Sequence, residues 1–110
     1  MGITKTEIFS NTQNKFSILF KVLGNPARVA ILEYLMNVDS CICGDITQEV
    51  GLAQPTVSQH LKELRNAGLI KGSINGNSIC YCIDKMHWKR ARKMINSFMK
   101  KDIIGLKNCC

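Results

Sequence analysis

Side chains that can form hydrogen bonds with nucleic-acid bases are concentrated in the stretch 54–69. Hydroxyls and amides donate and accept hydrogen bonds at base edges, whereas lysine and arginine pair with phosphates. Ordinary surface helices carry the same residue types, so this stretch alone leaves both interpretations open. Its polar positions are Thr56, Ser58, Gln59, Lys62, Arg65 and Asn66.

The same stretch shows the signals of a helix. Pro55 suits the first turn, where its missing N–H is not needed, and Gly68 suits the left-handed residue that ends a helix. Val57, Leu61 and Leu64 recur at helical spacing. We therefore predict an amphipathic helix that buries these three side chains and exposes its polar face.

The elements on both sides of this helix predict a winged helix-turn-helix. A short helix is expected between Asp45, its N-cap, and Gly51. Two short helices joined by a tight turn place the second one in the major groove. Residues 69–74 and 77–83 alternate in character and flank Asn75-Gly76, a strong hairpin signal. This wing would contact a groove or phosphate, or only face solvent, through Lys71, Asn75 and Asn77.

Three further helices complete the predicted fold. The first covers residues 7–23, the second starts at Asn25-Pro26, and the last is capped by Asp84. The last helix carries an apolar stripe that must fold onto the first helix, pair with a second copy of the chain, or both. We predict one domain over residues 1–110, mainly α (α+β), with about five helices and a two-stranded β-hairpin wing.

The amino-acid composition indicates which class of partner the protein binds and in which compartment it is expected. Lysine and arginine outnumber aspartate and glutamate by 15 to 8, and the isoelectric point is about 9.3. This balance suggests a polyanionic partner. No apolar run approaches the roughly 20 residues that span a bilayer, and the first residues lack the apolar core of a signal peptide. We expect a cytoplasmic protein without a membrane partner.

Six cysteines occur as three close pairs, Cys41/Cys43, Cys80/Cys82 and Cys109/Cys110. In a reducing compartment they should be thiols, so metal or redox chemistry is favoured over a disulfide framework. Cys80 and Cys82 would lie on one face of a strand, about 6.5–7 Å apart, a long separation for a shared metal. Packing is the preferred role for that pair.

Three segments taken together resemble the ArsR/SmtB family of bacterial winged-helix repressors. They are Leu23-Gly-Asn-Pro-Ala-Arg28, Gln54-Pro-Thr-Val-Ser-Gln-His-Leu61 and Ala67-Gly-Leu-Ile70, and the resemblance covers residues 16–100. It implies a homodimer on an inverted-repeat operator in double-stranded DNA, released by an inducer that is often a soft metal ion or arsenite. The implied dimerisation residues, on the first and last helices, are Phe16, Leu19, Phe20, Trp88, Ala91, Ile95 and Phe98.

The resemblance also assigns DNA contacts by position. Lys62 and Arg65 would lie nearer the backbone than the base-reading residues. His60 adjoins the buried stripe, so a packing role with one hydrogen bond is predicted as readily as a base contact. Arg28 is interpreted as a phosphate clamp or a solvated charge, with the phosphate favoured. The base-reading set would be Gln54, Thr56, Ser58, Gln59 and His60.

For the inducer, the sequence departs from the family pattern. Family members that sense soft metals carry Cys-x-Cys directly before Asp-Leu/Ile, but here Gly44 separates Cys43 from Asp45. A shift of one residue rotates a helical side chain by about 100°. Cys41 and Cys43 with a third thiolate, from Cys109 or Cys110 of either chain, would suit arsenite, and a fourth ligand would suit zinc or cadmium. A thiol redox or persulfide switch and inert cysteines are the alternatives.

The family's second metal site, on the last helix, is only half present. Asp84 and His87 resemble its beginning, but Ile95 and Phe98 occupy the region of its end. We therefore expect that zinc site to be absent.

Two other classes of protein, an enzyme and a winged helix used only for protein contacts, are less well supported. An enzyme would need a phosphate-cradling glycine loop, paired carboxylates or a cysteine beside a histidine, and the sequence provides none of them. A regulator without a metal response is a closer alternative. A winged helix used only for protein contacts would usually lose the cationic, amide-rich face that this chain keeps.

Overall fold

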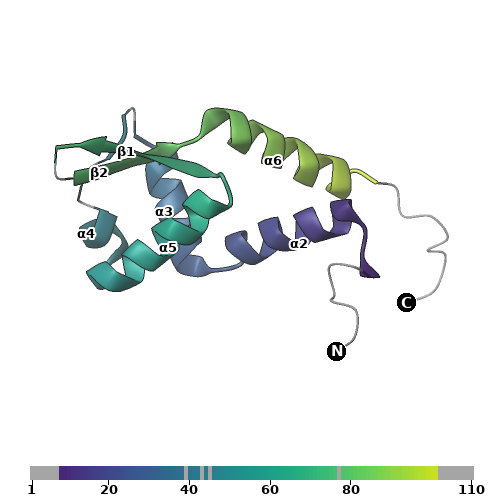
Figure 1. Ribbon diagram of the computed structural model, residues 1–110, viewed down its shortest axis with the longest axis horizontal. Coiled ribbons are helices and arrows are strands. Elements are labelled where there is room, and N and C mark those ends of the chain that lie inside the picture. Colours follow the sequence, from purple (N-terminus) through teal and green to yellow (C-terminus); the bar gives the residue numbers. More distant parts are fainter. Residues whose placement is uncertain (1–7, 39, 43, 45, 77, 102–110) are drawn as a thin grey trace.

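The computed structural model describes residues 8–38, 40–42, 44, 46–76 and 78–101. Five helices and an antiparallel hairpin occur within these ranges (Figure 1). This confirms the predicted mainly α fold with a hairpin wing. In chain order the elements are α2 (Asn11–Leu23), α3 (Pro26–Met36), α4 (Ile46–Val50), α5 (Gln54–Asn66), β1 (Ile70–Asn75), β2 (Ser78–Ile83) and α6 (Lys85–Met99).

Side-chain caps mark the starts of α2 and α3. Ser10 and Gln13 form a reciprocal capping box, so α2 starts at Asn11 and not at residue 7 as predicted. Asn25 accepts from the backbone N–H groups of Ala27 and Arg28 at the start of α3, with Pro26 in the first turn, as predicted. The predicted cap of α4, Asp45, lies outside the described residues.

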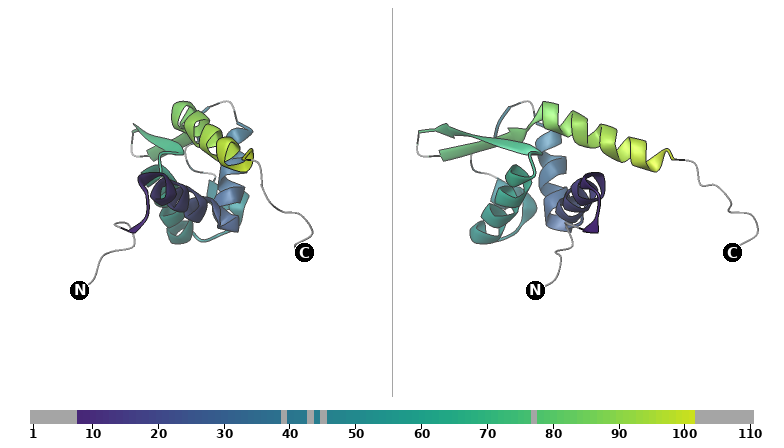
Figure 2. Two further views of the ribbon diagram at one scale, coloured as in Figure 1. Left: turned by 90° about the vertical axis from the view of Figure 1, so that its right-hand side faces the viewer. Right: turned by 45° about the vertical axis from the view of Figure 1, so that its right-hand side comes forward.

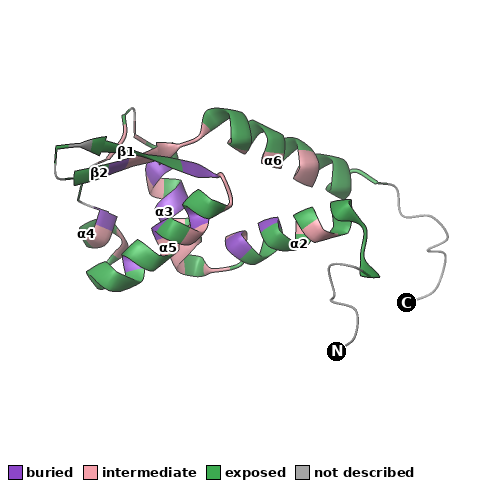
Figure 3. Ribbon diagram, in the orientation of Figure 1, coloured by how far each residue is buried: buried purple, intermediate pink, exposed green. Residues whose placement is uncertain are grey.

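The core lies where α3, α4, α5 and the base of the hairpin meet (Figure 3). Val57, Leu61 and Leu64 of α5 are all buried, which confirms the predicted stripe. They pack with Ile31 of α3 and Leu69 before β1. Because these three side chains fix the rotation of α5 about its axis, they also fix which of its residues face outward.

The hairpin has the predicted strands, but its turn is shifted by one residue. Asn75 pairs with Ser78, so the connection starts at Gly76 and Asn75 belongs to β1. Gly76 takes a positive φ of 65°, which glycine adopts without steric cost. In this register Ile70 lies opposite Ile83, and both contact the core.

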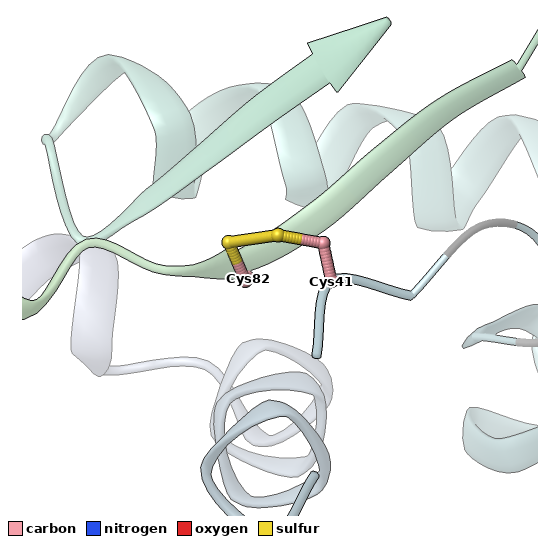
Figure 4. The surroundings of a disulfide bond; sticks show 2 residues. All are labelled: Cys41 and Cys82. Atoms are coloured by element: carbon pink, nitrogen blue, oxygen red, sulfur yellow. A yellow bond between two sulfur atoms is a disulfide. The ribbon is translucent and has the colours of Figure 1, made fainter. Parts of the chain in front are cut away.

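A segment before α4 extends the hairpin in a way that the sequence reasoning missed. Ile42 exchanges two backbone hydrogen bonds of 2.8 Å with Tyr81, on the edge of β2 away from β1. This antiparallel bridge places Cys41 beside Cys82, and the two form a disulfide (Figure 4). Cys80 is also disulfide-bonded. The expectations that disulfides would be absent and that Cys80 and Cys82 would only pack were therefore wrong.

Helices α2 and α6 extend from the other elements toward the same side of the molecule (Figure 1), and α6 projects beyond them (Figure 2, right). None of the side chains of α6 is buried. The predicted stripe on α6 is partly covered by its own chain. Trp88, Ala91 and Ile95 pack against the core. Phe98 contacts the rings of Phe16 and Phe20 in α2. Among the described residues, no helix combines the length and apolar character that a bilayer span requires.

Candidate nucleic-acid interface

The polar face predicted for α5 is exposed. It lies on the side of the helix away from the buried stripe, and its exposed residues include six predicted DNA contacts. The first turn of α5 has no side-chain cap, so its N–H groups remain available to an anion such as a phosphate. Those six exposed contacts are Gln54, Thr56, Ser58, Gln59, Lys62 and Arg65.

Hydrogen bonds hold the amide side chains of this face in defined positions. Thr47 of α4 donates from Oγ1 to Oε1 of Gln54 (2.7 Å), and Gln54 donates from Nε2 to Oγ of Ser58 (3.2 Å). Gln59 donates from Nε2 to Oε1 of Glu63 (3.1 Å). The Thr47 bond connects the two helices of the helix-turn-helix directly. Sequence reasoning did not include Thr47 or Glu63, because neither has a pattern that marks it.

Arg28 and His60 lie behind this face and contact each other. Arg28 donates from Nε to Nδ1 of His60 (3.2 Å) and from Nη1 to the carbonyls of Lys21 and Val22 (both 3.3 Å). Arg28 thus satisfies carbonyls at the end of α2 and links α3 to α5. His60 is half-buried with one hydrogen bond, as in the packing role considered for it. A phosphate contact by Arg28 stays a prediction.

Of the three wing residues predicted to contact DNA, only Lys71 has a side chain that the structure describes. Lys71 is exposed, but it pairs with Cys82 near the base of the hairpin, away from the turn. The side chain of Asn75 and all of Asn77 lie outside the described residues. Among the β1 residues whose side chains the structure describes, Ile74 is nearest the turn, and it is 83% exposed. The wing contacts of Lys71, Asn75 and Asn77 with DNA stay predictions.

An exposed apolar surface covers parts of α2 and α6. The rings of Phe16, Phe20 and Phe98 form a cluster with centroids 5.0–5.8 Å apart. Phe20 and Phe98 remain 40% and 44% exposed. Leu19, predicted in the same set, is instead buried in the core of its own chain and is not available to a second copy. We call Phe16, Phe20 and Phe98 the phenylalanine cluster.

Asp84 caps α6 and holds its first turn. Its Oδ1 accepts from the N–H of His87 (3.2 Å), and its Oδ2 lies 2.9 Å from Nδ1 of His87. The pKa of Asp84 lies below its usual value of 3.8, mainly because its carboxylate accepts the backbone hydrogen bond from His87. This interaction stabilises the folded protein at pH values above the pKa that Asp84 has in the unfolded chain. The stabilisation is lost as the pH falls through the lower pKa that Asp84 has in the folded protein.

Replacing Asp84 by asparagine should flatten the acid dependence of stability. Asparagine can still cap the helix but cannot titrate. We expect the free energy of unfolding of Asp84→Asn to be lower than that of the original protein at neutral pH. The difference should shrink as the pH falls below about 4. Denaturant unfolding at a series of pH values measures it, and parallel curves for the two proteins would contradict the role of Asp84.

Of the predicted metal ligands, Cys41 is the one that the structure describes, and it is not free to bind a metal ion. Cys41 is bonded to Cys82, and a disulfide sulfur is not the thiolate that a soft metal requires. Residues 41 and 42 run along β2 and not along a helical turn, which turns Cys41 toward Cys82. Cys43, Cys109 and Cys110 lie outside the described residues. Across the described ranges, no three histidine, cysteine or acidic side chains are grouped to hold a metal ion.

The arrangement of α4, α5 and the hairpin defines the winged helix-turn-helix class. Residues 25–71 match the family described as bacterial regulatory protein, arsR family. The crystal structure of Rv0081 from Mycobacterium tuberculosis superposes with a TM-score of 0.63 and 29% identity, covering 83% of this chain and 95% of that chain.

Curated relatives agree with the match. An HTH-type transcriptional regulator of Methanocaldococcus jannaschii is 35% identical over 83 residues, 74% of this chain and 92% of that protein. The arsenical resistance operon repressor of Staphylococcus xylosus is 36% identical over 67 residues, 61% of this chain and 64% of that protein. The chain is 39% identical to the M. tuberculosis regulator over 64 residues. These residues are 58% of this chain but only 56% of that protein.

The chain belongs to the ArsR family of bacterial regulatory proteins. The predicted resemblance is confirmed. The family consists of transcriptional regulators and not of enzymes, which agrees with the prediction from the sequence.

Proposed function

We propose that the protein is a homodimeric transcriptional repressor that inserts α5 into the major groove of an operator. The observation that carries the proposal is the division of α5 into a buried stripe and an exposed face of amides, hydroxyls and cations. A helix of this kind, presented by a preceding short helix, is the unit that reads base edges. The net charge of +7 supports attraction to the phosphate backbone.

A second copy of the chain is part of the proposal. The phenylalanine cluster and the apolar stripe of α6 are incompletely covered in one chain, and burying them between two copies would remove apolar surface from water. Twofold symmetry would then present two α5 helices to successive turns of the duplex, about 34–36 Å apart. The operator would be an inverted repeat.

An inducer of the soft-metal or arsenite class would act only on the reduced chain. Such ligands bind thiolates, and Cys41 has no thiolate while it is bonded to Cys82. Reduction would have to precede metal binding at this position. A regulator that does not respond to metal is the alternative.

Substitutions on α5 should separate base readout from backbone contact. Gln59→Ala should relax the base preference at one position by about 1–3 kcal/mol. Lys62→Ala should weaken binding to all sequences alike and reduce the slope of log affinity against log salt by about 1. Fluorescence anisotropy with the selected operator and with single-base variants measures both.

The matched control is Lys100→Ala, which removes one exposed cation beyond the end of α6. It should leave both the base preference and the salt slope close to those of the original protein. If Gln59→Ala kept the original base preference, Gln59 would be removed from the base-reading set. If Lys62→Ala and Lys100→Ala behaved alike, α5 would not be the contact surface.

A further inference from the structure

The Cys41–Cys82 disulfide lines an open cleft of about 710 Å³. The walls come from the end of α3, the base of the hairpin and the first turn of α6, and α5 contributes no residue. Trp88 contributes an aromatic side chain to the wall. A cleft of this volume accommodates a molecule the size of a short peptide.

The charges that line this cleft favour an anion. Lys71 lies directly across β1 and β2 from Cys82, so their side chains share one face of the hairpin. Lys85 is a second exposed cation in the lining. Among the lining residues that the structure describes, Asp84 is the one carboxylate, and it already accepts from the N–H of His87 and contacts its ring. With two lysines against one carboxylate, the described lining carries a formal charge of +1 when His87 is neutral.

The disulfide can be reached from the cleft. Cys41 and Cys82 are half-buried, whereas Cys80, two residues along the same strand, is only 3% exposed. A dissolved reactant therefore meets the Cys41–Cys82 bond before it meets Cys80. Thiol–disulfide exchange requires this access, because the attacking sulfur must reach one of the two bonded sulfurs.

We propose that the cleft binds a small anionic thiol and that the Cys41–Cys82 disulfide exchanges with it. The incoming thiolate attacks Sγ of Cys41, the Cys41–Cys82 bond breaks, and the electron pair leaves on Sγ of Cys82. Lys71 stabilises the Cys82 thiolate, so Cys82 is the better leaving group. The immediate product is a mixed disulfide between the small thiol and Cys41.

A second thiol molecule completes the reduction. Its thiolate attacks the sulfur of the first small molecule in the mixed disulfide, which releases a small symmetric disulfide and the thiolate of Cys41. The protein disulfide gains two electrons, and two small thiols are oxidised to one disulfide. The reverse sequence reoxidises the protein. This site is separate from α5 and does not depend on DNA binding.

The proposal is tested by comparing thiols that differ in charge. The oxidised protein would be treated with glutathione, 2-mercaptoethanol and cysteamine, which are anionic, neutral and cationic, at equal thiolate concentrations. Opening of the Cys41–Cys82 bond would be followed by alkylation of new thiols and peptide mapping. We expect glutathione to react at least about threefold faster than cysteamine, the size of effect that partly exposed charges produce.

The lysine variants show whether that preference comes from the cleft. Lys71→Gln and Lys85→Gln should each reduce the ratio of the glutathione rate to the cysteamine rate, while Lys100→Gln, outside the cleft, should keep it. Equal ratios in all four proteins, or a faster reaction with cysteamine, would overturn the proposal. Thermal unfolding of each variant would verify that it is folded.

A trapping experiment tests the site without relying on rates. In Cys82→Ser no partner thiol remains at position 82 to resolve a mixed disulfide on Cys41. Incubation with oxidised glutathione should therefore leave a stable glutathione adduct on the peptide that contains Cys41. Lys71→Gln in this background should leave the adduct on the same residue. An adduct found only on other cysteines would contradict the assignment of Cys41.

Discussion

Phe98→Asp should convert the protein to a monomer and weaken its binding to an inverted-repeat operator by about 100-fold or more. Phe98 is the residue of α6 that joins the phenylalanine cluster, and it is 44% exposed in the single chain. A carboxylate at this position would have to be buried unpaired if two copies met there, and this desolvation is strongly unfavourable. Without dimerisation each α5 would bind its half-site alone, and the gain from simultaneous contact would be lost.

Sedimentation velocity measures the mass, and anisotropy on the same samples measures the affinity. The matched control is Lys93→Gln, which changes the net charge by the same amount at an exposed position of the same helix. We expect Lys93→Gln to remain dimeric and to bind within a few-fold of the original protein. A Phe98→Asp variant that sedimented as a dimer with unchanged affinity would place the interface elsewhere.

Loss of the Cys41–Cys82 disulfide should lower the free energy of unfolding by about 3–4 kcal/mol. The two cysteines are 41 residues apart in the sequence. A cross-link over a loop of that length restricts the unfolded chain, and the chain-entropy relation gives about 4 kcal/mol. Cys82→Ser should therefore unfold at a clearly lower urea concentration than the oxidised protein.

Reduction of the original protein provides the control for the serine substitution. Under reducing conditions, which also open the disulfide of Cys80, the original protein and Cys82→Ser should unfold at nearly the same urea concentration. Cys82→Ser itself should not respond to reduction at this position. If the oxidised and reduced proteins unfolded at the same urea concentration, the disulfide would have no stabilising role.

The helices were predictable because their signals are local. The Asn25-Pro26 start of α3 and the Asp84 cap of α6 act within one turn, and the structure contains both. The spacing of Val57, Leu61 and Leu64 also determines which face of α5 is buried. That face in turn determines which polar residues are exposed, so most of the predicted contact surface followed from the same periodicity.

The features that were missed depend on partners distant in sequence. Ile42 and Tyr81 lie on opposite sides of the helix-turn-helix in the sequence, so no pattern among neighbouring residues predicts the bridge between them. One clue existed, because Cys-Ile-Cys at 41–43 and Cys-Tyr-Cys at 80–82 have the same alternation and could have been paired as strands. The contact of Arg28 with His60 is likewise invisible in a linear pattern.

The turn of the hairpin was displaced for a related reason. Asn75-Gly76 has the favoured composition for the two central residues, but the register of the whole hairpin sets where the turn falls. Pairing Ile70 with Ile83 directs both to the core and makes Asn75 a strand residue. Contacts along the entire strand therefore outweighed the local preference of two residues.

The most direct test of the central claim is selection of duplexes from a random pool by the purified protein, followed by affinity measurements over a range of salt concentrations. We predict an inverted repeat with half-sites one helical turn apart, and an affinity that falls steeply as salt rises. The same slope should be shallower by about 1 in Lys62→Ala. No enrichment of any sequence, together with no binding to duplex DNA in dilute buffer, would contradict the proposed role of α5.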